Sequence, residues 1–356
     1  MSLVNMPFGF IKKERLYILM ALFVISTNLF LASGHIERNI KLPSCEAINL
    51  MSAEETPARE ERIKEALEEN KFLAVVVAGV SFLFAIALIL GLTISVKCLS
   101  AKLSGRSFMA AYGHIPDIRW NVADVLKTLV VFLFLGYILQ FAEIFIASIL
   151  KLKQPDEKLF TVVYAALMDV LGIAVIFYFV VKKFKEKFSS LGLSFKNSFR
   201  NIRIGAAAYL ALLPFLAITA ITVLAVLRMI GYEPPGSPIL EIFYEDSRPK
   251  ILLVLTILVT ILGPIAEELF FRGLAYPAIR KRLGIKSAMI LVSAAFAMLH
   301  ANILALLPIF ILGILLAYLY EKTGSLIPSI TVHIIHNSAL VLSVYVYKML
   351  GAAAGY

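Results

Sequence analysis

Two carboxylates and a guanidinium stand close together at Glu267, Glu268 and Arg272, directly after an apolar stretch. Residues 251–266 contain no ionisable side chain. An ionised side chain at membrane depth costs at least ~2.5–3.5 kcal/mol on insertion scales, so such residues are rare and usually functional. The three charges therefore mark a candidate site.

Three further polar residues follow in apolar segments downstream. His300 ends one segment, and His333 and Asn337 lie four residues apart in another, so a helix would present both on one face. A carboxylate with a histidine can activate water. An imidazole N–H and an amide N–H can donate to a developing oxyanion. Together with Glu267, these groups could hydrolyse an amide bond without a protein nucleophile.

Glu268 and Arg272 are expected to support this site. They are four residues apart, so on a helix they share a face and can form an ion pair. Glu267 lies about 100° around the helix from Glu268, so the two carboxylates point in different directions. In the alternative interpretation, the ion pair only locks helices together, and His333 with Asn337 only makes polar contacts between helices.

Pro264 gives a further expectation about Glu267. Proline cannot donate a hydrogen bond to the carbonyl of Thr260, so we expect the helix to be kinked or restarted there. Glu267 would then lie near a local helix N-terminus, where backbone dipoles favour a negative charge.

No cofactor is expected for this reaction. Glu267, His300 and His333 would also suit a catalytic zinc ion, as two histidines and a carboxylate, and this remains the alternative. The sequence has no His-Glu-x-x-His helix, and each zinc ligand would come from a different segment. Cys45 and Cys98 are far apart and support neither a disulfide framework nor a thiol metal site.

The composition predicts that membrane helices position these residues. Hydrophobic residues make up 60% of the 356 positions, charged residues 16%, and the mean hydropathy is +0.87. Soluble domains are nearer ~45–50% apolar and ~25% charged. We therefore expect an all-α polytopic transmembrane bundle of about nine helices. The expected spans are residues 16–34, 72–96, 128–150, 160–181, 204–230, 251–270, 287–300, 303–320 and 326–347.

The positive charge follows the loops of such a bundle. The net charge of +10 comes from short basic loops between apolar spans, which indicates the lipid bilayer as partner and not nucleic acid. These loops predict a multi-pass protein of the plasma membrane with its N-terminus in the cytosol. The loop from His35 to Lys71 is acid-rich and expected outside, with a short charged helix at 54–71.

Three regions are expected along the chain. The first span should remain as an anchor, and the alternative is a signal peptide cleaved near residues 32–34. Counted from the predicted bounds, Glu267 lies toward the cytosolic end of its helix, whereas His300 lies deep in the next one. They can meet only if the helices are kinked, tilted or bounded differently.

The three expected regions are an N-terminal two-helix part with a charged extracytoplasmic loop (1–105), the helices of the bundle (106–249) and the catalytic core (250–348).

The polar motifs resemble those of the CPBP family, which comprises type II CAAX prenyl endopeptidases, bacteriocin-processing and immunity proteins, and Abi proteins. That family shows Glu-Glu-x-x-x-Arg, then Phe-x-x-x-His, then His-x-x-x-Asn or Asp. All three occur here in order within residues 263–340. They are Glu267-Glu268-x-x-x-Arg272, Phe296-x-x-x-His300 and His333-x-x-x-Asn337.

The resemblance implies a metal-independent glutamate intramembrane protease. It implies that Glu267 with His300 activates the water and that His333 with Asn337 forms the oxyanion hole. Glu268 and Arg272 would hold the site together or meet the substrate.

The implied activity is cleavage of a membrane-embedded or lipidated peptide. Eukaryotic and archaeal members of the family remove three residues after a prenylated cysteine. Other members have non-proteolytic roles, so the substrate does not carry over. A non-catalytic bacteriocin-immunity or scaffold protein that binds a partner in the same cavity is the alternative. A transporter or proton relay fits less well, because the charges cluster in one stretch and do not line a route.

Overall fold

The computed structural model describes residues 8–37, 56–105, 113–149, 156–232 and 238–355, and every regular element in these ranges is a helix. The predicted all-α fold is therefore confirmed. Within these ranges, seven helical segments are long and apolar enough to cross a membrane, and one of them, Pro249–Met298, is two helices joined across a kink at Gly284. The predicted first span lies within helix α1 (Phe8–Glu37). The predicted spans 251–270 and 287–300 lie on the two sides of the Gly284 kink.

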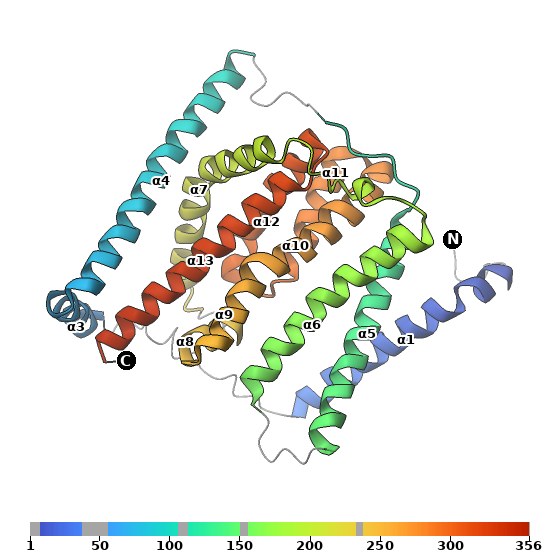
Figure 1. Ribbon diagram of the computed structural model, residues 1–356, viewed down its shortest axis with the longest axis horizontal. Coiled ribbons are helices and arrows are strands. Elements are labelled where there is room, and N and C mark those ends of the chain that lie inside the picture. The colour runs from blue at the N-terminus through green and yellow to red at the C-terminus, as the bar shows by residue number, and fades with distance from the viewer. Residues whose placement is uncertain (1–7, 38–55, 106–112, 150–155, 233–237, 356) are drawn as a thin grey trace. The chain divides into compact units, whose positions relative to one another are not determined.

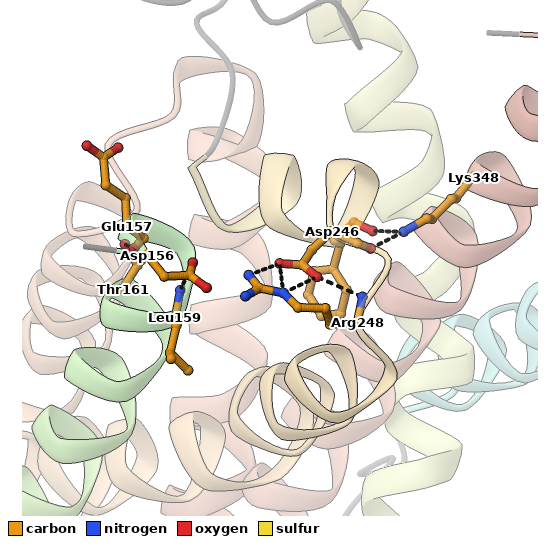
Figure 2. A network of polar contacts seen from close by, with 8 residues as sticks. Asp156, Glu157, Leu159, Thr161, Asp246, Arg248 and Lys348 are labelled. Carbon is orange, nitrogen blue, oxygen red and sulfur yellow. Dashed lines mark hydrogen bonds and ion pairs between the residues drawn. The ribbon is translucent and has the colours of Figure 1, made fainter. Parts of the chain in front are cut away.

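The chain forms two compact units, of which the first comprises residues 1–42 and 119–186. It contains α1, α5 (Val122–Ile149) and α6 (Glu157–Phe177), and α5 packs against both of the others (Figure 1). The Asp156 carboxylate caps α6 by accepting a hydrogen bond from the backbone N–H of Leu159 at 3.0 Å (Figure 2).

The second unit, residues 43–118 and 187–356, contains every predicted site residue. Within it α13 packs against α7 and α12, and α4 packs against α7. Helix α3 lies beside the C-terminal end of α13 (Figure 1), and it confirms the charged helix predicted at 54–71. Cys45 and the first part of the predicted external loop lie outside the described residues. The helices of this unit are α3 (Thr56–Glu69), α4 (Lys71–Leu103), α7 (Ser198–Met229), α8 (Pro238–Glu245), α9 (Pro249–Ile257), α10 (Gly263–Glu268), α11 (Tyr276–Met298), α12 (Ile303–Thr323) and α13 (Ile327–Ala353).

Two π-helical segments join α9, α10 and α11. They are η4 (Leu258–Leu262) and η5 (Leu269–Ala275), one on each side of the two glutamates. Such segments occur frequently at functional sites. The η4 segment directly precedes Pro264, and the backbone remains right-handed through Leu262 and Gly263. The helix is thus not restarted at the proline, and the expected helix N-terminus beside Glu267 is wrong.

The bounds of these helices also place Glu267 and His300 at a similar depth in the bundle. Gly284, with φ 80° and ψ 172°, divides α11 and reverses the chain there. A positive φ of this kind favours glycine because it has no Cβ. Glu267 lies 17 residues before Gly284 and His300 lies 16 residues after it, which places each roughly 25 Å from the bend at 1.5 Å per residue. The depth mismatch expected from the sequence is therefore absent, because the helix before the bend is longer than its apolar stretch.

The ends of α9 and α13 are fastened by a polar cluster. The guanidinium of Arg248 lies against the carboxylate of Asp246, with a closest N–O distance of 2.6 Å, and the Asp246 side chain is only 3% exposed. Lys348 of α13 donates to the backbone carbonyls of Phe243, at 3.1 Å, and of Asp246 (Figure 2). Helix α13 carries His333 and Asn337, and α9 leads through η4 to the two glutamates, so this cluster fixes the two helices relative to each other.

Close contact between α7 and α13 depends on Gly205. A Cβ at this position would lie 2.6 Å from the backbone carbonyl oxygen of Pro328. Small residues allow membrane helices to approach in this way. We expect Gly205→Ala to destabilise the fold by about 1–3 kcal/mol, the usual cost of overpacking. Thermal unfolding of the detergent-solubilised protein measures this effect.

Gly79 of α4 is the matched control for this substitution. It is also in a helix, and no atom lies within 4 Å of a Cβ added there. Gly79→Ala should leave stability unchanged or raise it, since alanine favours helix more than glycine does. Equal melting temperatures for Gly205→Ala and the wild type would contradict the close approach.

Candidate active site

A fully buried ion pair forms the base of the candidate site. The side chains of Glu268 and Arg272 are both 0% exposed, and Arg272 Nη1 donates to Glu268 Oε1 at 2.7 Å. Arg272 Nη2 donates to the carbonyl of Gly313 on α12 at 3.2 Å. The guanidinium carbon lies 4.5 Å from the ring centre of Phe296, a cation–π geometry. The predicted pair, formed within α10 and η5, thus also contacts α11 and α12.

His333 connects this ion pair to the second glutamate. Its Nδ1 lies 3.0 Å from Glu268 Oε1, and its Nε2 lies 3.7 Å from Glu267 Oε2. An ionised carboxylate can only accept hydrogen bonds, so Nδ1 carries the proton shared with Glu268. Glu268 and Arg272 therefore orient the His333 ring, and its Nε2 faces Glu267.

Glu267 differs from Glu268 in its freedom to react. Its side chain is 40% exposed, whereas that of Glu268 is fully buried. The Oε2 atom of Glu267 is buried, and no described residue offers it a hydrogen bond. Glu268 Oε2 also lacks a hydrogen-bond partner among the described residues, but the whole Glu268 side chain is buried, so Glu267 is the carboxylate that a water or a substrate can reach.

His300 lies at the turn between α11 and α12. Its Nδ1 lies 2.9 Å from the carbonyl oxygen of Phe296, which accepts, so Nε2 remains as the acceptor. The next residue, Ala301, has φ 47°, a strained conformation for a residue with a Cβ. Asn302 caps α12 by accepting hydrogen bonds from two backbone N–H groups. The end of α11 therefore fixes the position of His300.

Phe296 brings the two histidines onto one surface. Its ring centre lies 5.0 Å from that of His300 and 5.5 Å from that of His333, both edge-on. Within the described residues, His300 makes no hydrogen bond with Glu267. The structure thus brings Glu267 next to His333. His300 contacts the other side of this group through the ring of Phe296, which packs against both histidines.

Asn337 lies one turn after His333 on α13 and contacts the helix of the glutamates. Its Nδ2 donates to the carbonyl of Val259, in η4, at 2.8 Å. The amide has two N–H groups, so one of them remains for a substrate. The neighbouring His336 packs instead toward α7, with Nδ1 3.5 Å from the hydroxyl of Tyr209.

The partners that the sequence did not reveal are backbone carbonyls. Gly313 accepts from Arg272, and Val259 accepts from Asn337. Every residue supplies a carbonyl, so residue type gives no signal for them. Gly313 also lets α12 approach α11 closely, because a Cβ there would lie 3.0 Å from the Cβ of Ser293 on α11.

The described ranges contain no cluster of metal ligands. No three His, Cys, Asp or Glu side chains in them are placed to hold one metal ion. A cavity of about 550 Å³ lies between α5 and α6, with Glu143 and Glu157 in its lining. Its lining residues all belong to the first unit, whereas the predicted site residues belong to the second.

The segment from α9 to the middle of α13 carries this whole arrangement. Residues 249–339 match the family model of Rce1-like type II CAAX prenyl endopeptidases. The match covers about a quarter of the chain and includes all three motifs, which confirms the resemblance predicted from them. No curated protein and no solved structure matches the chain. The Rce1-like segment is thus the part of the protein with a recognisable family, and its geometry limits what the site can do.

Proposed function

We propose that the protein is an intramembrane endopeptidase in which water, activated by Glu267 and His300, attacks a peptide bond. One observation carries this proposal. Of the two adjacent carboxylates, Glu268 is fully buried against Arg272 and His333, whereas the Glu267 side chain is 40% exposed and its Oε2 lies 3.7 Å from His333 Nε2. A carboxylate that only locked the helices together would be enclosed by its partners, as Glu268 is, and would not face water or a substrate.

The proposed chemistry uses the groups as the structure orients them. Glu267, with Nε2 of His300, takes a proton from water as the oxygen attacks the carbonyl carbon. The oxyanion accepts hydrogen bonds from the free N–H of Asn337 and from Nε2–H of His333 when both nitrogens of that ring are protonated. The C–N bond then breaks, and the proton held by Glu267 passes to the leaving amine.

The substrate class follows from the surroundings and from the family. Helices long and apolar enough to cross a membrane carry the site, so the scissile bond must reach it from a membrane-embedded or lipidated peptide. The match to prenyl endopeptidases supports a peptide with a prenylated cysteine as the first substrate to test. The basic loops support a plasma-membrane protein with its N-terminus in the cytosol.

A cleavage assay with the full chain in nanodiscs tests this proposal. A farnesylated peptide with three residues after its cysteine, the same peptide without lipid, and an unlipidated transmembrane peptide are incubated with the protein, and products are identified by mass. We expect cleavage of at least one membrane-bound peptide and its loss in His300→Ala. Saturable binding of these peptides without any product would instead support the scaffold or immunity function.

The same assay separates water activation by glutamate from zinc catalysis. We expect the cleavage rate to remain unchanged after prolonged incubation with a strong chelator, and we expect no zinc in the purified protein by elemental analysis. A rate that falls with chelator and returns on adding zinc would assign Glu267, His300 and His333 to a metal site.

A further inference from the structure

The helical turn before the two glutamates contains a backbone carbonyl for which the helix offers no regular donor. In an α-helix the carbonyl of a residue accepts from the N–H four residues later, and in a π-helix from the N–H five residues later. For Val259 of η4 these two positions are Gly263 and Pro264. The N–H of Gly263 donates to the carbonyl of Leu258. Pro264 has no N–H to donate.

The π-helical spacing of η4 decides which carbonyl the proline leaves without a donor. In a regular α-helix it would be the carbonyl of Thr260, four residues before Pro264. The bond from Gly263 to Leu258 spans five residues, and the same spacing from Pro264 leads to Val259. Pro264 is buried. A buried carbonyl without a donor is costly, so the Val259 carbonyl requires a donor from outside its own helix.

Asn337 of α13 supplies that donor. Its Nδ2 donates to the Val259 carbonyl at 2.8 Å. A carbonyl oxygen can only accept, so it selects the NH₂ end of the amide and keeps the Oδ1 end away from η4. The amide group is planar, so fixing one N–H also fixes the direction of the other. The Val259 carbonyl thus orients the second N–H, the one that the proposed reaction directs at the oxyanion.

We propose that Pro264 is a positioning residue for Asn337. Because it withholds an N–H from the Val259 carbonyl, that carbonyl stays available to hold the Asn337 amide. Pro264 touches no reacting atom and acts through these two groups. The catalytic consequence rests on the proposed function, whereas the link from Pro264 to Asn337 can be tested without a substrate.

Thermal unfolding of four detergent-solubilised proteins tests this link. They are the wild type, Pro264→Ala, Asn337→Ala and the double variant. In the wild type, Asn337→Ala removes the donor to the Val259 carbonyl, so the melting temperature should fall. Alanine at 264 brings an N–H that can donate to the same carbonyl. Asn337→Ala should therefore lower the melting temperature clearly less in the Pro264→Ala protein, and equal falls in both would overturn the proposal.

Cleavage kinetics test the consequence for the reaction. Pro264→Ala should lower kcat about 10–10²-fold with little change in KM, because a misdirected N–H stabilises the transition state less. Its melting temperature should not fall, since alanine is far more favourable inside a helix than proline. Lost stability then cannot explain the lower rate. A Pro264→Ala protein that cleaves with the kcat of the wild type would overturn the proposal.

Pro214→Ala is the matched control. Pro214 also lies inside a helix, α7, and it packs close to Gly91 of α4. This variant should keep the wild-type kcat, and its effect on the melting temperature should add to that of Asn337→Ala. Equal effects of the two proline substitutions on kcat would overturn the proposal, because any helical proline would then act alike. A wild type that cleaves no peptide would refute the proposed function, and the unfolding comparison would still decide whether Pro264 holds Asn337.

Discussion

The Glu267→Gln variant should cleave peptide about 10²–10⁴-fold more slowly than the wild type while remaining equally stable. Glutamine has nearly the shape of glutamate but cannot take a proton from water, and removal of a general base has an effect of this size. The Glu267 side chain is 40% exposed, and its Oε2 accepts no hydrogen bond from a described residue, so the substitution breaks no buried pair. Single-turnover cleavage rates and melting curves on one preparation measure both quantities.

Controls for this prediction distinguish the two adjacent carboxylates. Glu65→Gln on the exposed face of α3 makes the same chemical change far from the site along the chain and should alter neither rate nor stability. Glu268→Gln should reduce both, because Glu268 is fully buried against Arg272 and His333. Full turnover in Glu267→Gln together with lost turnover in a folded Glu268→Gln would exchange the roles of the two residues. Unchanged turnover in both would remove the carboxylates from the mechanism.

The helices and the grouping of polar motifs were predictable, because burying charge in lipid is costly. Glu268 and Arg272 had to pair, and His333 had to find a polar partner, so separate apolar segments with polar residues had to meet. Residue spacing was sufficient to place Glu268 with Arg272 on one face. The same reasoning could not say which carboxylate His333 would contact, because that depends on the rotation of α13 against α10.

What the sequence could not predict was the path of the backbone. The π-helical segments around Glu267 shift the register of side chains without any distinctive residue pattern, apart from Pro264. Residues 251–270 and 287–300 are predicted as separate spans because hydropathy falls at the basic residues between them, but the first helix continues past Arg280 and Arg282 to the kink at Gly284. Hydropathy records what lipid tolerates, and a helix can extend beyond the bilayer into water.

The buried pair itself gives the second large prediction. Arg272→Met should lower the free energy of unfolding by about 3–5 kcal/mol, because it leaves the fully buried carboxylate of Glu268 without its cation. The double variant Glu268→Gln/Arg272→Met should recover most of this loss, since no uncompensated charge then remains.

Arg280→Met is the control. Arg280 pairs with Glu321 at 2.8 Å but is 36% exposed, so water can replace the lost cation and the cost should stay within about 1 kcal/mol. Equal and additive losses for Glu268→Gln and Arg272→Met would show that the two residues act independently. The inference that Glu268 is held as a charged partner for His333 would then be wrong, and both glutamates would have to be reconsidered as acids in the reaction.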